Sequence, residues 1–393
     1  MIISARQWAV GLAGFVSFLN LYSPQAILPL LGNEFAAGAA EISAIMTAGA
    51  LAVALIAPFT GTVADVVGRK RVIVFAMAMI AVPTAMQALS PTLNGVIFWK
   101  FVQGLCLPPI FGVTLAYIGE EWPRREAARA VGIYTAGASL GGLCARFATG
   151  VLADLAGWRT AFLMLAAVTL ASALAVAVML PREQKFVRSA GFLASARQML
   201  RHFRNPQLLA TYAVGFGTLF NFIATFTFVS FHLAGPPYRL SASAIGAIFL
   251  TYLVGTVLSP MVGWAINRFG RRTCMIGIIA AWMGGVALTL AAPLPLIVAG
   301  VAVCAGAGIL AQAISTGYVA ISAERGASSA VGLYVTAFYI GGSAGAALGG
   351  LAWIAGGWPA CVALVLGMQA IMIAVVWAVW TPEPPVAPRR PSA

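Results

Sequence analysis

The chain has 393 residues, of which 61% are hydrophobic and only 8% are charged. Soluble domains carry about 25% charged residues, so this composition excludes a soluble globular fold and indicates a protein whose solvent is lipid. The net charge is +13, but the basic residues occur in short runs between apolar segments. Nucleic-acid binding needs a concentrated basic face, so no nucleic-acid partner is expected.

Apolar runs of about 20 residues, each ended by charge, glycine or proline, predict an all-α integral membrane protein with twelve transmembrane helices. The first run has no signal-peptide character and is interpreted as an uncleaved span. In the first half of the chain the predicted helices cover residues 8–31, 42–63, 72–89, 93–117, 130–153 and 159–180. In the second half they cover residues 208–234, 243–266, 273–292, 296–319, 330–352 and 359–380.

An internal duplication relates the two halves. Val131-Gly132-Ile133-Tyr134 returns as Val331-Gly332-Leu333-Tyr334, and Gly157-Trp158 returns as Gly357-Trp358. The duplication predicts two six-helix bundles, residues 1–180 and 208–380, related by a pseudo-two-fold axis. A substrate pathway usually runs along the seam between such halves, so the pattern is typical of a transporter.

The distribution of Lys and Arg predicts the orientation. Only Arg159 and Arg239 fall on the predicted outer side, and only Lys100 and Arg146 fall well within spans. Both termini are therefore expected in the cytoplasm, in a multi-pass protein of a bacterial inner membrane.

Two segments are expected outside the bundles. Residues 181–207 form a basic cytoplasmic linker with an amphipathic helix that lies on anionic membrane lipids. The proline-rich tail, residues 381–393, is expected to be disordered.

The loop between the second and third predicted spans carries a motif. It reads Gly61-Thr62-Val63-Ala64-Asp65-Val66-Val67-Gly68-Arg69-Lys70-Arg71, and it resembles the loop signature of the major facilitator superfamily. The resemblance implies a conformational latch between the bundles, with Asp65 as its acid. The second-half copy keeps Gly263, Gly270 and Arg271 but has Asn267 where the acid would be. The first-half latch is therefore expected to be the stronger one.

Within that superfamily the chain resembles the twelve-span drug:proton antiporters and bacterial efflux permeases. Asn20-Leu21-Tyr22-Ser23-Pro24-Gln25 is similar to the start of such permeases, and Phe101-Val102-Gln103-Gly104 is similar to their Arg-x-x-Gln-Gly motif. Lys100 stands where they carry Arg, and Gly142 stands where the fifth span normally has Pro. These departures place more doubt on proton-coupled drug export than on the fold.

Lys100 and Arg146 are the two cations predicted well within spans. At about 1.5 Å per residue, both lie roughly 10 Å below the outer ends of their helices. Because charge within a membrane is costly, they are interpreted as a shared cavity wall that attracts an anionic group. The alternative is that each reaches the outer interface or pairs with carbonyls or with an acid such as Glu34, Glu41 or Asp154.

Neutral polar residues complete the predicted cavity. Asn20 and Asn221 occupy corresponding places in the two halves and either bind substrate or bond across helices. Further cavity candidates are Gln25, Gln103, Thr225, Gln312 and Tyr339. His232, Glu34 and Asp154 are candidates for proton coupling, although a lone interfacial histidine is more often a packing residue.

The sequence therefore predicts a secondary transporter, acting as a monomer by alternating access, that exports a small organic solute, with protons as a candidate coupling ion. The substrate is expected to be anionic, zwitterionic or neutral and polar, since no acid lies near the middle of a span. The alternatives are a multidrug:proton antiporter for lipophilic compounds, a non-transporting membrane receptor and a membrane-embedded enzyme. No catalytic dyad, metal site or cofactor motif is visible, and the five cysteines are interpreted as packing residues.

Overall fold

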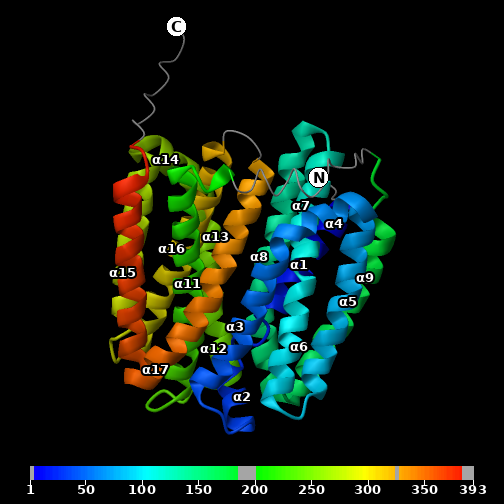
Figure 1. The fold of residues 1–393 in the computed structure, drawn as a ribbon. Helices are drawn as coiled ribbons and strands as arrows, with labels where there is room; N and C mark the ends of the chain where they lie inside the picture. Colours follow the sequence, from blue (N-terminus) through cyan, green and yellow to red (C-terminus); the bar gives the residue numbers. More distant parts are fainter. Residues whose placement is uncertain (1–3, 185–200, 324–326, 383–393) are drawn as a thin grey trace.

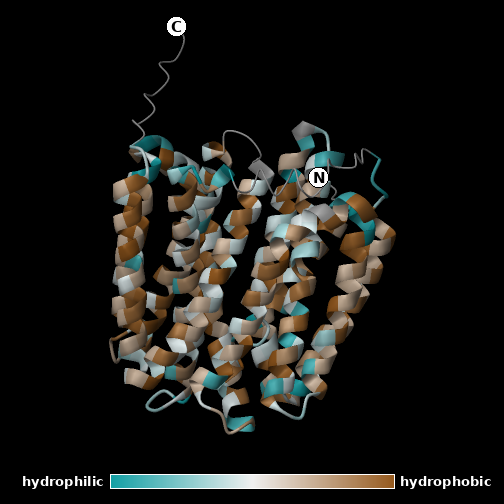
Figure 2. Ribbon diagram, viewed as in Figure 1, coloured by the Kyte–Doolittle hydropathy of each residue, from teal (hydrophilic) through white to brown (hydrophobic). Residues whose placement is uncertain are grey.

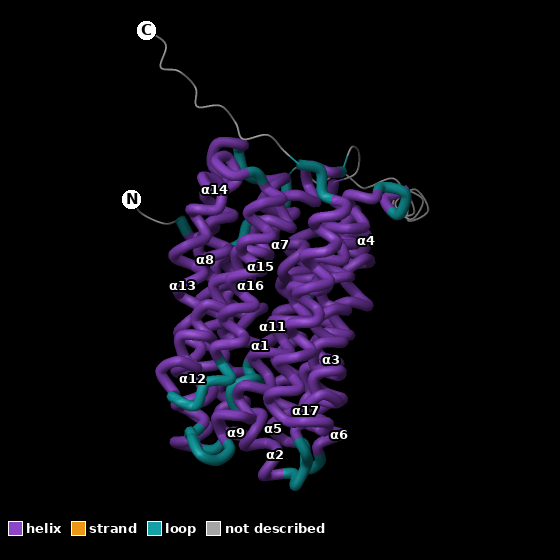
Figure 3. Tube along the Cα trace, turned by 90° about the vertical axis from the view of Figure 1, so that its left-hand side faces the viewer, coloured by secondary structure: helices purple, strands orange, loops and turns teal. Residues whose placement is uncertain are grey.

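The computed structural model is a bundle of long helices that run side by side (Figure 1). It describes residues 4–184, 201–323 and 327–382, so most of the predicted linker helix and of the tail lies outside the described residues. Apolar residues cover the lengths of the helices and polar residues gather at the two ends (Figure 2). Most loops also lie at these ends (Figure 3). Helices satisfy their backbone hydrogen bonds internally, which is the requirement that lipid imposes.

The first half of the chain forms the helices on one side of the molecule in Figure 1. They are α1 (Ala5–Tyr22), α2 (Leu28–Glu34), α3 (Ala39–Ile56), α4 (Thr60–Val67), α5 (Arg69–Leu89), α6 (Leu93–Cys106), α7 (Pro108–Glu121), α8 (Arg124–Ala156) and α9 (Trp158–Met179). A short 3-10 turn at residues 57–59 joins α3 to α4.

The second half forms the other side. Its helices are α11 (Pro206–Ala234), α12 (Ala242–Ile248), α13 (Tyr252–Leu258), α14 (Val262–Phe269), α15 (Arg271–Leu288), α16 (Leu294–Ser322) and α17 (Ala327–Val379). Residues 249–251 and 259–261 are 3-10 turns between α12, α13 and α14.

Nine helices of the described ranges are long and apolar enough to cross a membrane. The predicted number of twelve stays a prediction, because several predicted spans are interrupted or joined. The first predicted span is divided into α1 and α2, and α17 runs through two predicted spans with a non-helical break at Gly356 and Gly357.

The duplication reappears in the backbone. Gly68 and Gly270 begin α5 and α15 with φ values of +103° and +79°. Gly157 and Gly357 have φ values of +82° and +62° and separate the last two predicted spans of each half. Residues other than glycine rarely adopt this backbone conformation, so each pair of glycines fixes the same sharp turn in both halves.

The same helix crossing also occurs in each half. A Cβ atom added to Gly141 would lie 2.0 Å from the Phe15 carbonyl oxygen, where α8 crosses α1. A Cβ atom added to Gly341 would lie 2.0 Å from the Phe216 carbonyl oxygen, where α17 crosses α11. Only glycine allows backbones to approach this closely, so each pair packs as one rigid unit.

The two halves meet closely at the end that holds α2 and α12, called the α2 end below. A Cβ atom on Gly150 would lie 2.4 Å from the Ala242 carbonyl oxygen, and one on Gly350 would lie 3.0 Å from the Cα atom of Ala40. Asp154 Oδ2 accepts a hydrogen bond from the Ser243 backbone N–H at 2.7 Å. This end of the seam is therefore tightly packed.

The opposite end, called the α4 end, holds α4, α14 and the start of α1 (Figure 1). On one face of α8, Gly142 and Arg146 are buried toward the α2 end, whereas Thr135 and Ser139 are exposed toward the α4 end. No described atom outside the local helix lies within 4 Å of a Cβ added to Gly132. On the other side of the seam the two halves still touch at this end, because α17 contacts the turn at residues 57–59. The looser packing is therefore confined to the α8 side.

Candidate functional site

A break in the first predicted span organises the candidate site. It covers residues 23–27, between α1 and α2. Pro24 has no backbone N–H, so the Asn20 carbonyl four residues earlier has no helical donor. The Gln25 N–H donates to the Tyr22 carbonyl at 3.1 Å, and not to the Leu21 carbonyl that it would reach in a continuous helix. Two carbonyl oxygens at the end of α1 are therefore left for side chains to satisfy.

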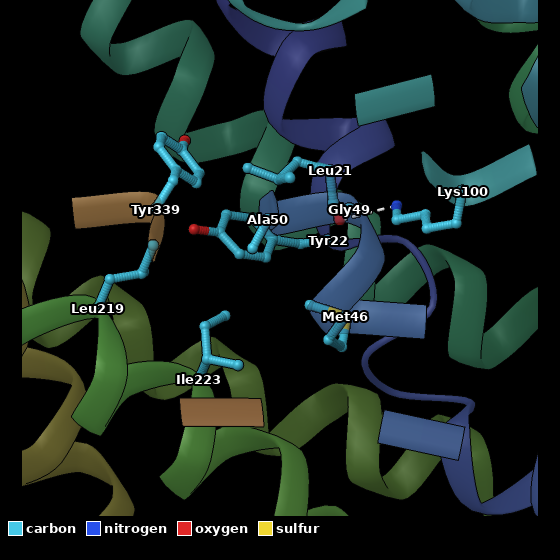
Figure 4. Close-up of a pocket in the computed structure, with 9 residues that line it drawn as sticks. All are labelled: Leu21, Tyr22, Met46, Gly49, Ala50, Lys100, Leu219, Ile223 and Tyr339. Carbon is cyan, nitrogen blue, oxygen red and sulfur yellow. Dashed lines mark hydrogen bonds between the residues drawn. The ribbon is translucent and has the colours of Figure 1, made fainter. Parts of the chain in front are cut away.

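Lys100 from α6 satisfies both of these carbonyls. Its Nζ atom donates to Asn20 O at 2.8 Å, to Leu21 O at 3.0 Å and to Gln103 Oε1 at 2.7 Å. The side chain is only 1% exposed, and Figure 4 shows it reaching the end of α1 from behind Gly49. A cation stabilises the C-terminal end of a helix. All three ammonium protons therefore have neutral acceptors, and pairing with carbonyls, the alternative given above, describes Lys100.

Asn20 is the centre of a buried amide network. Its Nδ2 atom donates to Thr169 Oγ1 at 2.9 Å, and its Oδ1 atom lies 2.7 Å from Thr84 Oγ1. Gln103 Nε2 donates to Thr84 Oγ1 at 2.7 Å and to Asn20 Oδ1 at 3.2 Å. The structure thus brings Asn20, Gln103 and Lys100 together, and the network joins four helices within the first half.

Asn221, the counterpart of Asn20, lies in the second half with fewer partners. Its Nδ2 atom donates to Met372 Sδ at 3.2 Å, and its Oδ1 atom has no partner among the described residues. The hydroxyl of Thr225 and both amide atoms of Gln369 are buried without a described partner as well. Gln369 corresponds to Thr169 in the repeat. The second half therefore has the corresponding amide but no comparable hydrogen-bond network.

Arg146 from α8 lies on the other side of the break. Its Nε atom donates to Gln25 Oε1 at 2.7 Å, and its Nη1 atom donates to Gly142 O at 2.6 Å. The guanidinium carbon lies 4.0 Å from the ring centre of Tyr22, 4.5 Å from that of Tyr252 and 5.0 Å from that of Phe249.

These three rings form what we call the aromatic cage of Arg146: Tyr22, Phe249 and Tyr252. The sequence analysis missed the cage, because two of its rings come from the second half and nothing in their local sequence points to Arg146. Each cation–π contact contributes about 0.5–2 kcal/mol.

A small cavity lies between the halves beside the cage. It measures about 40 Å³, and its walls include Tyr22, Phe222, Gln312 and Tyr339. A second cavity of about 10 Å³ lies between Tyr339 and Lys100 (Figure 4). Gln312 and Tyr339, predicted cavity residues, thus line a space at the seam. The larger cavity has room for water but not for an organic solute, so binding of a solute requires its walls to move apart.

Two of the predicted proton-coupling residues lie at the α2 end with local partners. Glu34 forms an ion pair with Arg159 at 2.5 Å, and both side chains are about 40% exposed. The ring of His232 stacks on Trp358 at 5.7 Å between centres. The third candidate, Asp154, is the one whose hydrogen bond crosses the seam.

The loop motif lies at the α4 end. Asp65 and Arg69 form an ion pair at 2.6 Å, and Arg69 also binds Glu120 with contacts of 2.7 and 3.1 Å. Glu183 Oε2 accepts a hydrogen bond from the Lys70 backbone N–H at 3.3 Å. All of these residues belong to the first half or to the chain just after it, so the ion pair of Asp65 lies on one side of the seam.

The remaining motif residues are looser. A Cβ atom added to Gly61 or to Gly263 would meet no described atom within 4 Å outside its own helix. Arg71 and Asn267 are exposed. The guanidinium of Arg271 lies 5.2 Å from the Tyr318 ring centre. A latch between the bundles stays a prediction, because in this conformation the two copies of the motif each contact their own half.

The described residues offer no metal site. Among the described residues no group of three His, Cys, Asp or Glu side chains could hold a metal ion. All five cysteines are free thiols.

Comparison with known proteins identifies the family. The family model described as Major Facilitator Superfamily matches residues 10–255 and 214–393. The inner membrane transport protein YnfM of Escherichia coli is 30% identical over 369 residues, which cover 92% of this chain and 87% of YnfM. An uncharacterized MFS-type transporter of Bacillus subtilis, YybF, is 26% identical over 364 residues, which cover 92% of this chain and 90% of YybF.

Solved structures show the same fold at low sequence identity. The nucleoside transporter NupG superposes with a TM-score of 0.78 at 16% identity, over 95% of this chain and 100% of NupG. A bacterial homologue of the human lysosomal transporter Spinster, in an inward-facing and unoccupied conformation, superposes with a TM-score of 0.70 at 16% identity. That match covers 94% of this chain and 93% of the homologue.

Proposed function

Because the chain belongs to the Major Facilitator Superfamily, and is a membrane transporter and not an enzyme, we propose that it moves a small organic solute across the bacterial inner membrane by alternating access. The two halves, α1–α9 and α11–α17, are the moving units. The proposed direction is efflux, from a chamber open to the cytoplasm.

The observation that carries this proposal is the unequal packing along the seam. At the α2 end, Gly150 and Gly350 bring backbones of the two halves into contact. Toward the α4 end, Thr135 and Ser139 on α8 and Gln312 on α16 are exposed. Such a gradient is expected of a transporter caught with one gate closed and the other partly open.

The distribution of basic residues supports the assignment of the sides. Arg69, Lys70 and Arg71 lie at the α4 end, and the linker after α9 begins there with Arg182. Cytoplasmic loops carry the excess of Lys and Arg, so the α4 end is the cytoplasmic one in this proposal. The solute would enter from the cytoplasm and leave when the α2 end separates.

We assign proton coupling to Asp154. Its carboxylate accepts a hydrogen bond from the other half at the closed gate. Protonation from the outer side removes the charge that strengthens this bond. Glu34 is already paired within the first half and His232 stacks on Trp358 in the second half, so neither connects the two halves.

Alternating access is tested without knowing the solute. In a chain with its five cysteines replaced by alanine, Ala40→Cys and Gly350→Cys form a disulfide that locks the α2 end. A Cβ atom on Gly350 lies 3.2 Å from that of Ala40, and disulfides span about 3.5–4.5 Å between Cβ atoms, so the two backbones must shift by a few tenths of an ångström and the lock still holds them together. A third cysteine, Ser139→Cys, reports access to the seam when a membrane-impermeant maleimide is added to either side of membrane vesicles. The lock should abolish labelling from the periplasmic side and keep labelling from the cytoplasmic side.

Two results contradict the proposal. One is periplasmic labelling that persists after complete cross-linking, and the other is periplasmic labelling that never occurs in the unlocked protein. Direction is tested in everted vesicles, because an efflux transporter accumulates its solute in their lumen.

A further inference from the structure

We propose that Arg146 binds the carboxylate of the transported solute, and that this carboxylate replaces rings of the aromatic cage when it binds. The inference rests on the proposed function and deepens it, because it names the substrate class as organic monocarboxylates. It assigns recognition of the anion to Arg146 alone, whereas the sequence suggested a wall shared with Lys100.

The charge of Arg146 has no counterion among the described residues. The side chain is 1% exposed, and none of the ion pairs among the described residues includes it. Burying a charge within a membrane is costly, so an arginine there is normally paired or functional. The rings of Tyr22, Phe249 and Tyr252 offset part of this cost, and a carboxylate would offset more of it.

Hydrogen-bonding groups without a described partner surround the guanidinium. Arg146 Nη2, Gln25 Nε2 and the Tyr252 hydroxyl are all buried without a partner among the described residues. Gln25 is held against Arg146 by its own Oε1 atom, so its Nε2 lies nearby. All three groups can donate hydrogen bonds, and a carboxylate accepts up to four. The unmet chemistry is therefore that of a carboxylate.

Arg146 also lies between the cavity and the closed gate. Tyr22 is a wall of the 40 Å³ cavity on one side and a ring of the cage on the other. A Cβ atom added to Gly246 of the second half would lie 2.9 Å from the Arg146 carbonyl oxygen. A ligand that displaces Tyr252 from the guanidinium therefore loosens a contact between the halves, which links binding to opening of the α2 end.

Lys100 differs from Arg146 in its hydrogen bonds. Its three protons are already taken by neutral acceptors of the first half, so none is left for a solute in the 10 Å³ cavity that it lines. Arg146 is also a single-copy residue, because its counterpart in the repeat is Ala346. The anion site is therefore asymmetric and is built around one guanidinium.

Calorimetric titration of the protein in lipid nanodiscs tests the proposal with two probes that differ in charge, benzoate and benzamide. An aromatic acid is chosen because Phe18, Phe222 and Phe338 line the cavity. Benzoate should bind at least about tenfold more tightly than benzamide, the size expected of charge-assisted hydrogen bonding to the free Nη2 atom. Arg146→Gln should bring the two affinities to within about twofold of each other.

Two further variants separate recognition from stability. Tyr252→Phe removes a hydroxyl that has no described partner, so the melting temperature should hold or rise while benzoate affinity falls several-fold. Arg159→Gln removes a cation at the same end that does not touch the cage, and it should leave benzoate binding unchanged. Undiminished benzoate preference in a folded Arg146→Gln protein would overturn the proposal, as would failure of benzoate to bind the wild-type chain.

The outcome is independent of the access experiment. If the Ser139→Cys labelling follows the lock but benzoate is not preferred, transport stands and the monocarboxylate assignment fails. If benzoate binds through Arg146 but the disulfide does not change the labelling of Ser139→Cys, the site is a receptor site and the alternating-access proposal fails.

Discussion

Gly150→Ala should shift the protein toward a state in which the α2 end is open. The added Cβ atom would lie 2.4 Å from the Ala242 carbonyl oxygen, whereas ordinary contacts of this kind begin near 3.4 Å. α8 and α12 must therefore move apart by roughly 1 Å, and the opposing group is backbone that cannot rotate away. Overpacking of this kind costs about 1–3 kcal/mol, and only the closed state bears it. At 1.36 kcal/mol per factor of ten, the ratio of open to closed protein should rise about 5- to 150-fold.

The assay is a distance measurement between spin labels at Leu155→Cys on α8 and Ala355→Cys on α17, both exposed at the α2 end. Gly150→Ala should move the distance distribution toward longer values. Gly132→Ala is the matched control, because it makes the same change on the same helix where a Cβ atom meets no described neighbour within 4 Å. Identical distributions for wild type and both variants would refute the idea that this contact closes the gate.

Three other predictions concern stability, each read as a melting temperature in detergent. Gly141→Ala places a Cβ atom 2.0 Å from the Phe15 carbonyl oxygen inside the first half, so it should destabilise both states and lower the yield of folded protein, unlike Gly150→Ala. Lys100→Met leaves the Leu21 carbonyl and the Gln103 amide oxygen without their donor, whereas the Ser23 hydroxyl still donates to the Asn20 carbonyl, so it should cost about 1–3 kcal/mol per unsatisfied group; an unchanged melting temperature would mean that water replaces the ammonium. Glu34→Gln should cost less than about 1 kcal/mol, because its ion pair with Arg159 is about 40% exposed.

The repeat in the sequence predicted the features that both halves share. Gly68 and Gly270 turn the chain in the same way, and Gly141 and Gly341 allow the same helix crossing at the same distance. Such features depend on backbone conformation and on the absence of a side chain, which are properties of a residue and its neighbours. They can be recognised from spacing alone.

The arrangement around the first span could not be predicted in the same way. The sequence placed Lys100 and Arg146 at the same depth, but it did not show that they approach the break at residues 23–27 from opposite sides. That relation depends on how α6 and α8 pack around α1, which involves contacts between residues about 80 and 121 positions apart. Pro24 was visible in the sequence as a helix breaker, but the cations that satisfy the broken end were not linked to it.

The residues that differ between the halves are the ones whose charge or hydrogen-bonding groups could bind a solute. Asn20 has a complete network whereas the Asn221 side-chain oxygen has no partner among the described residues, and Arg146 has Ala346 as its counterpart. Two symmetric halves would bind a solute equally well in two opposed orientations. A single guanidinium at the seam removes that degeneracy, because it gives the chamber one charged end near the gate at the α2 end. The shared backbone features therefore belong to the proposed movement of the halves, and the unshared charge belongs to the proposed orientation of the solute between them.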